Sequence, residues 1–157
     1  MRKGAIYMDM LVNLNRLPAL AVPEGVRVVR ALPPDRQKIL DFVARNFPHW
    51  VDECAMALNF QPNACFIAVR EGRLAGFACY DATAKGFFGP IGVEEGERGS
   101  GVGKALLLHC LHAMAWDGYG YAAIGWCGGA KEFYAKCVGA VPIPNSEPED
   151  SVYGRMI

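Results

Sequence analysis

The chain lacks a long uninterrupted apolar segment and an excess of charge of either sign. Its 16 Lys and Arg residues balance its 16 Asp and Glu residues, so the formal net charge is zero. This balance removes the electrostatic basis for binding nucleic acid or an anionic membrane surface. Polar residues such as Asp9 and Arg16 interrupt the apolar stretch near the start, which makes a poor signal peptide and a poor membrane span. We therefore expect a cytoplasmic protein with no nucleic-acid or membrane partner.

The cysteines also lack the spacings that are typical of metal sites. The six cysteines form no C-x-x-C pair and no Cys/His cluster of the kind that holds a metal. Most of them fall within apolar segments, which favours small buried hydrophobic residues in a reducing compartment over disulfides. His109 and His112, three apart in an expected helix, could face a metal together, but no third ligand is in view. We expect no metal.

No repeat or low-complexity segment is present, and 157 residues suit one domain with one core. We expect residues 23–157 to form this domain. Residues 1–22 are expected to form an N-terminal arm or a short helix, because apolar residues recur there at helical spacing: Met10, Leu11, Leu14 and Leu17.

Apolar patterning and turn residues predict the order β, two helices, three strands, α, β, α, β. The expected strands are 26–31, 65–69, 74–81, 87–93, 121–126 and, at the edge, 152–157. The expected helices are 33–47, 49–58, 105–117 and 130–138. This order predicts an α/β (α+β) fold with early antiparallel hairpins and a β–α–β crossover around residues 97–104.

Residues 97–104 contain glycines at 99, 101 and 103 and lie between an expected strand and an expected helix. The first turn of a helix leaves backbone N–H groups without partners, and glycines let a phosphate approach them closely. A flexible turn would explain one or two of these glycines. Three in five residues instead indicate an anion site.

Neither common nucleotide loop fits these residues. The dinucleotide fingerprint needs G-x-G-x-x-G, whereas the spacing here is G-x-G-x-G. The P-loop needs G-x-x-x-x-G-K-[ST], but Lys104 is followed by Ala105 and the position five before Gly103 is Arg98.

The remaining pattern is Arg-x-x-Gly-x-Gly, made by Arg98, Gly101 and Gly103. It resembles the acyl-coenzyme A loop of the GCN5-related N-acetyltransferase (GNAT) superfamily. Downstream, residues 130–136 match that family's Ala-x-x-Phe-Tyr-x-Lys signature, although one extra residue precedes Gly139 and Ala140 replaces the usual Phe. The resemblance covers about residues 26–157.

The resemblance implies a mixed, mostly antiparallel twisted sheet with helices on both faces and its fourth and fifth strands splayed apart. It implies acetyl-CoA (coenzyme A) as co-substrate, with the pantetheine arm along the fourth strand. The cofactor-binding residues that it implies are Ile91, Gly92, Val93, Arg98, Gly99, Ser100, Gly101, Val102, Gly103, Lys104, Cys127, Phe133 and Tyr134. Lys104 could equally be a solvated helix residue, and Ser100 could be an N-cap. Cys127 stands where the family often has Asn.

The implied reaction is transfer of an acetyl group to a primary amine of a small molecule or peptide. The backbone N–H near Val93 would stabilise the oxyanion, and Tyr134 would act as general acid toward the leaving thiolate. The candidates for a base are Glu94, Glu95, Asp81, Asp52 and Glu53. Aromatic residues that could line the acceptor pocket are Tyr7, Phe47, Trp50, Phe60 and Trp126. A homodimer is compatible with the resemblance, and the alternative function is a non-catalytic acyl-CoA-binding module.

Overall fold

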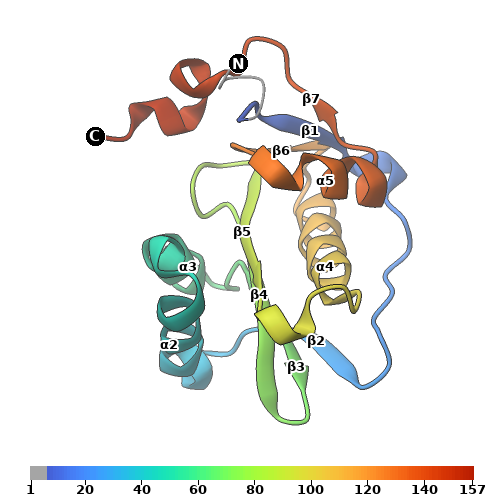
Figure 1. Cartoon of the computed structure of the whole chain (residues 1–157), viewed down its shortest axis with the longest axis vertical. Coiled ribbons are helices and arrows are strands. Elements are labelled where there is room, and N and C mark those ends of the chain that lie inside the picture. The colour runs from blue at the N-terminus through green and yellow to red at the C-terminus, as the bar shows by residue number, and fades with distance from the viewer. Residues whose placement is uncertain (1–6) are drawn as a thin grey trace.

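The structure, a computed structural model, describes residues 7–157 and is built around a seven-stranded sheet (Figure 1). The strand order is β2-β3-β4-β5-β6-β1-β7. All neighbouring strands are antiparallel except β5 and β6, which run parallel. The strands are β1 (Met10–Asn13), β2 (Val26–Arg30), β3 (Cys65–Arg70), β4 (Arg73–Tyr80), β5 (Phe87–Val93), β6 (Tyr121–Ile124) and β7 (Val141–Pro142). The expected mixed, mostly antiparallel sheet is confirmed.

Helices cover both faces of this sheet, as expected (Figure 1). The α-helices are α2 (Arg36–Asn46), α3 (Val51–Leu58), α4 (Val102–Trp116) and α5 (Lys131–Val138). Helices α2 and α3 pack on one face against β4, and α4 packs on the other against β3, β4 and β5. Side chains such as Phe42 on α2 and Leu106 on α4 are buried between the helices and the sheet. The apolar runs of both segments therefore form one continuous core.

The hairpin and the crossover form where the sequence predicts them. Glu71 and Gly72 join β3 to β4 with φ angles of 51° and 73°, the left-handed pair of a two-residue hairpin. Helix α4 connects β5 to the parallel β6, which makes the expected β–α–β unit. These local signals are strong because turn chemistry and helix length leave few alternatives.

The expected N-terminal helix is wrong. Residues 10–13 form β1, which pairs with β6 on one side and β7 on the other. Met10 and Val12 are buried, whereas Leu11 between them is 37% exposed, so burial alternates as in a strand. Residues 14–16 form only a 3-10 turn. Residues 1–6 of the expected arm lie outside the described part of the chain.

The expected C-terminal edge strand is also wrong. Residues Val152–Arg155 form a 3-10 helix, η7, whose first turn is capped by Ser151 accepting a hydrogen bond from the Tyr153 N–H. The edge position belongs instead to β7. The strand expected over 121–126 ends at Ile124, and Trp126 adopts a left-handed φ of 45°. The tail from β7 onward then lies at the same end of the sheet as the described N-terminus (Figure 1).

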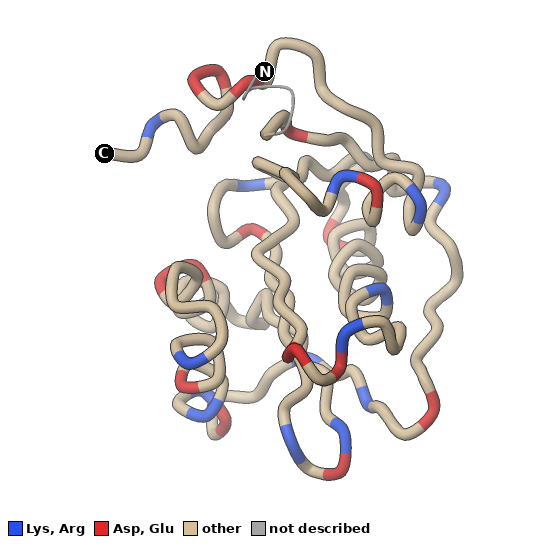
Figure 2. The backbone as a smooth tube through the Cα atoms, in the orientation of Figure 1, with Lys and Arg blue, Asp and Glu red and all other residues tan. Residues whose placement is uncertain are grey.

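Along the described backbone, Lys and Arg positions are interspersed with Asp and Glu positions, with no long stretch of one sign (Figure 2). None of the helices within residues 7–157 combines the length and the apolarity that crossing a bilayer requires. All six cysteines are free thiols, and Cys137 alone among them is not buried.

Candidate functional site

The sheet opens between its two parallel strands. β5 and β6 pair only at Phe87–Ala123 and Phe88–Ile124, so the rest of β5 has no neighbour on that side. On the other side, the Glu94 N–H donates to the Ala75 carbonyl at 2.8 Å. Hydrogen bonding alternates along an antiparallel pair, which turns the peptide groups of Ile91 and Val93 toward the open side. The splayed pair is therefore confirmed, and on its edge the Val93 carbonyl accepts a hydrogen bond from the Arg98 Nε at 3.3 Å.

The glycine loop lies at the mouth of this opening. Gly99 and Gly101 have φ angles of 80° and 90°, which other residues rarely adopt. Gly101 is the N-cap of α4, and the first backbone hydrogen bond there runs from the Ala105 N–H to the Gly101 carbonyl at 3.1 Å. The N–H groups of residues 102–104 consequently have no acceptor within the helix. The Ser100 hydroxyl donates to the Glu97 carbonyl, so its alternative role as the N-cap is wrong.

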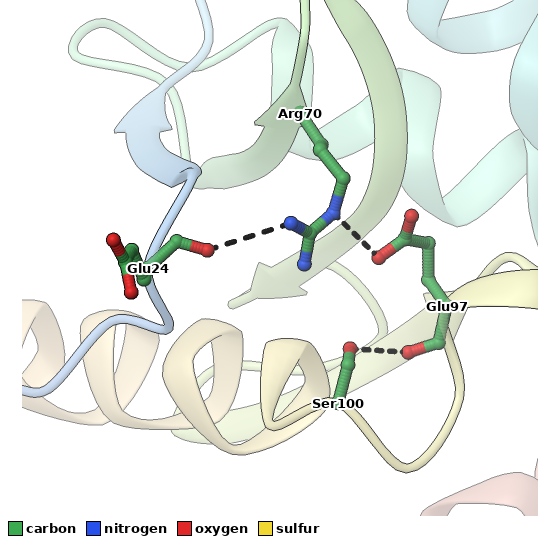
Figure 3. Close-up of polar contacts among 4 residues, drawn as sticks. All are labelled: Glu24, Arg70, Glu97 and Ser100. Atoms are coloured by element: carbon green, nitrogen blue, oxygen red, sulfur yellow. Dashed lines mark hydrogen bonds and ion pairs between the residues drawn. The ribbon is translucent and has the colours of Figure 1, made fainter.

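An arginine from the β3–β4 hairpin clamps the loop. The Arg70 Nε lies 3.0 Å from the Glu97 carboxylate, and its terminal nitrogen donates to the Glu24 carbonyl at 3.4 Å (Figure 3). Figure 3 also shows Ser100 bonded to the backbone of the same Glu97. Glu97 lines the cavity beside the glycines, where its charge would repel an anion. Pairing with Arg70 offsets that charge and holds the loop in place.

A cavity of about 510 Å³ lies between the glycine loop, β5 and α5. It is lined by Ile91, Val93, Glu97, Arg98, Gly99, Gly101, Gly103, Lys104, Ala130, Phe133 and Tyr134. It thus brings together nine of the thirteen residues that the resemblance implies. We call it the loop cavity.

The other four cofactor-binding residues that the resemblance implies do not line the loop cavity. Val102 is fully buried, and Ser100 is turned to Glu97. A side chain at Gly92 would meet the Phe47 ring at 2.5 Å, so this glycine makes room for an aromatic ring on the α2 side of the sheet. Cys127 lines a neighbouring cavity rather than the loop cavity.

The neighbouring cavity, of about 360 Å³, lies between α3, the ends of β5 and β6, and the C-terminal tail. It is lined by Trp50, Glu53, Phe88, Gly89, Pro90, Ile91, Ile124, Gly125, Trp126, Cys127, Ala130, Tyr134 and Tyr153. Only Ile91, Ala130 and Tyr134 line both cavities. We call it the acceptor cavity, after the role proposed for it below. Trp50 and Trp126 are the two of the five expected pocket aromatics that line it.

Tyr134 stands at the junction of the two cavities. Its ring is 6% exposed and packs edge-on against Phe88, with ring centroids 6.2 Å apart, and against Phe133 at 5.3 Å. Within residues 7–157, no group is hydrogen-bonded to its hydroxyl. Burial raises the pKa of Tyr134 well above its usual range, so the phenol is protonated at neutral pH.

Glu53 is the one expected base that reaches the acceptor cavity. The Thr83 hydroxyl donates to its Oε2, and the Tyr153 hydroxyl donates in turn to Thr83 Oγ1 at 3.2 Å. Burial raises the pKa of Glu53, an effect that the nearby Tyr153 hydroxyl partly opposes. Asp81, by contrast, is occupied by the Gly86 N–H at 2.7 Å and the Tyr119 hydroxyl at 2.9 Å.

Asp9 anchors the tail that closes the acceptor cavity. Its carboxylate is 5% exposed and accepts hydrogen bonds from the Trp126 N–H and the Ser151 hydroxyl, both at 3.0 Å. A side chain at Gly125 would meet the Tyr153 ring at 2.2 Å, so this glycine lets the tail lie against the end of β6. The sequence offers no local signal for Tyr153, because the tail reaches the cavity only through this long-range anchor.

The side chains that could bind a metal have other contacts in this structure. The His109 Nδ1 lies 2.8 Å from the Ala105 carbonyl, and the His112 Nε2 lies 2.7 Å from the Pro18 carbonyl. Cys54, Cys65 and Cys79 bring their sulfur atoms within 4.8 Å of one another in the core. Several thiolates together there would be costly, so neutral thiols packing as small apolar groups suit this position.

A parallel strand pair that splays beside a glycine-lined helix start is the architecture of the GCN5-related acetyltransferase fold. The sequence profile of the acetyltransferase (GNAT) family matches residues 36–140. The chain therefore belongs to the GNAT family.

The chain is also similar to individual acetyltransferases. A mycothiol acetyltransferase of Thermobispora bispora is 37% identical over 112 residues, which cover 59% of this chain and 38% of that protein. The chain thus matches well under half of that relative's length. A GCN5-related N-acetyltransferase of Sphaerobacter thermophilus superposes with a TM-score of 0.68 at 22% identity, covering 87% of this chain and 48% of that one. A Brucella melitensis GNAT acetyltransferase solved with acetyl-CoA superposes with a TM-score of 0.52 at 17% identity, covering 78% and 91% of the two chains.

Proposed function

We propose that this chain transfers an acetyl group from acetyl-CoA to a primary amine. The observation that carries the proposal is the meeting of two cavities at Ile91, Ala130 and Tyr134. One cavity suits a phosphorylated donor, and the other holds a half-buried carboxylate suited to an amine. Acyl transfer requires the two substrates to be held side by side, which this junction provides.

The loop cavity has the features that coenzyme A needs. The N–H groups at the start of α4 and the left-handed glycines suit a diphosphate, and a side chain at Gly99 would meet no atom within 4 Å. Lys104 and Arg98 supply positive charge; the Arg98 Nε also donates to the Val93 carbonyl at 3.3 Å. The pantetheine arm would lie along β5 as an added strand.

The acceptor amine would give a proton to the Glu53 carboxylate and attack the thioester carbonyl. A C–N bond forms, and collapse of the tetrahedral intermediate breaks the C–S bond. A backbone N–H on the free edge of β5 would stabilise the oxyanion; Ile91, which lines both cavities, is better placed than Val93. The Tyr134 hydroxyl would protonate the leaving thiolate, whose thiol has a pKa of about 8.5, and the second proton lost by the attacking nitrogen would restore the phenol.

Replacing Tyr134 with Phe tests this assignment. We expect kcat for CoA release to fall by roughly 100-fold, because proton donation by a positioned group typically contributes that much, while the KM for acetyl-CoA changes little. Tyr121→Phe, on the exposed end of β6, is the matched control and should retain full activity. If acetyl-CoA raises the melting temperature but no amine releases CoA, the chain is a non-catalytic acyl-CoA-binding module instead.

A further inference from the structure

The charge composition of the acceptor cavity limits the ligands that it can bind. Glu53 is the only lining residue that carries a full charge at neutral pH, and no Lys, Arg or His is among the residues that line it within the described chain. A substrate carboxylate or phosphate there would face a like charge with no cation to pair it. Burying such an unpaired charge is strongly unfavourable.

The Glu53 carboxylate contacts two hydroxyl groups and no cation. Thr83 donates to its Oε2, and the Tyr153 hydroxyl, which donates to Thr83, also lies close enough to the carboxylate to lower its pKa. Within residues 7–157, no Lys, Arg or His is paired with Glu53. Burial, which raises the pKa of this carboxylate, also strengthens its attraction for an ammonium group.

The rest of the wall is mainly aromatic and aliphatic. Trp126 and Tyr153 lie with ring centroids 5.0 Å apart, and Trp50 and Phe88 line the same cavity. The Trp126 Nε1 is buried and has no hydrogen-bond partner in the described chain. Ring faces suit a cation or an apolar body. The polar side-chain groups of the wall besides Glu53 are few, chiefly the Trp126 Nε1 and the Tyr134 and Tyr153 hydroxyls, so a polyhydroxylated body would leave most of its hydroxyls unpaired. The volume of about 360 Å³ lies at the small end of ligand sites, which run from about 300 to 1,000 Å³.

We propose that the acceptor is a compact primary amine on an uncharged apolar body, alkyl or arylalkyl, and that Glu53 excludes amines bearing a negative charge. This inference rests on the proposed function and names its substrate class. Glu53 selects by charge, and the Trp50, Trp126 and Tyr153 rings seat the body. Free amino acids, phosphorylated amino sugars and unsubstituted amino sugars are all poor acceptors on this basis.

Phenethylamine and L-phenylalanine form the matched test pair, because they share the aryl body and the amine and differ by a carboxylate. We expect kcat/KM for phenylalanine to be at least about 100-fold lower, the scale set by leaving a buried charge unpaired. Glucosamine and glucosamine 6-phosphate, the sugar arms, should both fall well below phenethylamine. Equal or better use of phenylalanine, glucosamine or its phosphate would overturn the inference while leaving the acetyltransferase function intact.

Glu53→Gln separates charge selection from proton transfer. Loss of a base slows both members of the pair, so the ratio of their kcat/KM values reports only the charge effect. We expect this ratio to shrink by about tenfold or more, as removal of one like-charge repulsion allows. Glu71→Gln, exposed in the β3–β4 turn and outside both cavities, is the control and should leave the ratio unchanged. An unchanged ratio in Glu53→Gln refutes the selecting role, and absence of turnover with every amine, despite binding of acetyl-CoA, refutes the function itself.

Discussion

Replacing Asp9 should destabilise the tail and the acceptor cavity together. Asp9→Ala removes the acceptor of two hydrogen bonds, from the Trp126 N–H and the Ser151 hydroxyl, in a site that is 5% exposed. Each buried donor left without a partner costs about 1–3 kcal/mol, so the free energy of unfolding should fall by roughly 2–6 kcal/mol. At about 2–4 °C per kcal/mol for a domain of this size, the melting temperature should drop by roughly 4–24 °C.

Asp9→Asn is the informative companion, because both hydrogen bonds use the same oxygen, Oδ1, and an amide oxygen can still accept them. Only the charge assistance is lost, so we expect about 1–2 kcal/mol. Urea denaturation measures both losses, and steady-state kinetics should show a raised KM for the amine at an unchanged KM for acetyl-CoA. If the Ala variant unfolds within about 0.5 kcal/mol of the wild type, a typical surface effect, then Asp9 is no anchor.

Three further changes probe other parts of the site. Gly101→Val forces a β-branched residue into a left-handed φ of 90° and puts a side chain 3.2 Å from Pro23, so the KM for acetyl-CoA should rise at least about tenfold. An unaltered KM would show that the loop is a turn with no role in binding acetyl-CoA. Arg70→Gln leaves the Glu97 charge unpaired beside the loop cavity and should weaken acetyl-CoA binding, most clearly at low ionic strength, as calorimetry can show. Because burial raises the pKa of Glu53, the acidic limb of the pH profile of kcat/KM should lie above the range in which an exposed glutamate titrates, and activity should rise as pH increases through it. A limb at the ordinary glutamate pKa would argue against Glu53 as the base.

Local sequence patterns predict most of the elements of the fold. The hairpin at Glu71–Gly72 and the glycine loop each depend on the conformation of a few consecutive residues, which the sequence displays directly. The short helix expected near the N-terminus is wrong because two apolar patterns overlap there: Met10, Leu11, Leu14 and Leu17 fit helical spacing, whereas Met10, Val12 and Leu14 fit strand alternation. Pairing with β6 and β7 decided the outcome, and no short window of sequence contains that information.

The two cavities of the candidate site differ in the same way, because the sequence predicts the loop cavity much better than the acceptor cavity. The residues of the loop cavity come largely from one segment, 91–104, and one helix, so two motifs locate them. The acceptor cavity draws Glu53, Trp126 and Tyr153 from three distant segments. Glu53 was one of five acidic candidates, and only the packing of α3 against the end of the sheet distinguishes it. Tyr153 was not predicted, because the tail's path depends on Asp9.

The position of β1 within the sheet has a consequence for how the chain folds during synthesis. Of the described strands, the first to be synthesised lies between the last two, and the Asp9 N–H donates to the Ser146 hydroxyl oxygen across 137 positions. Until β6 and β7 have emerged, β1 has no strand to join, whereas β2–β5 and the helices around them can assemble as a hairpin-rich unit. Contacts of such long sequence separation form slowly. The glycine loop would thus form before the part of the sheet that completes the acceptor cavity, and that cavity would be the last part of this domain to take shape.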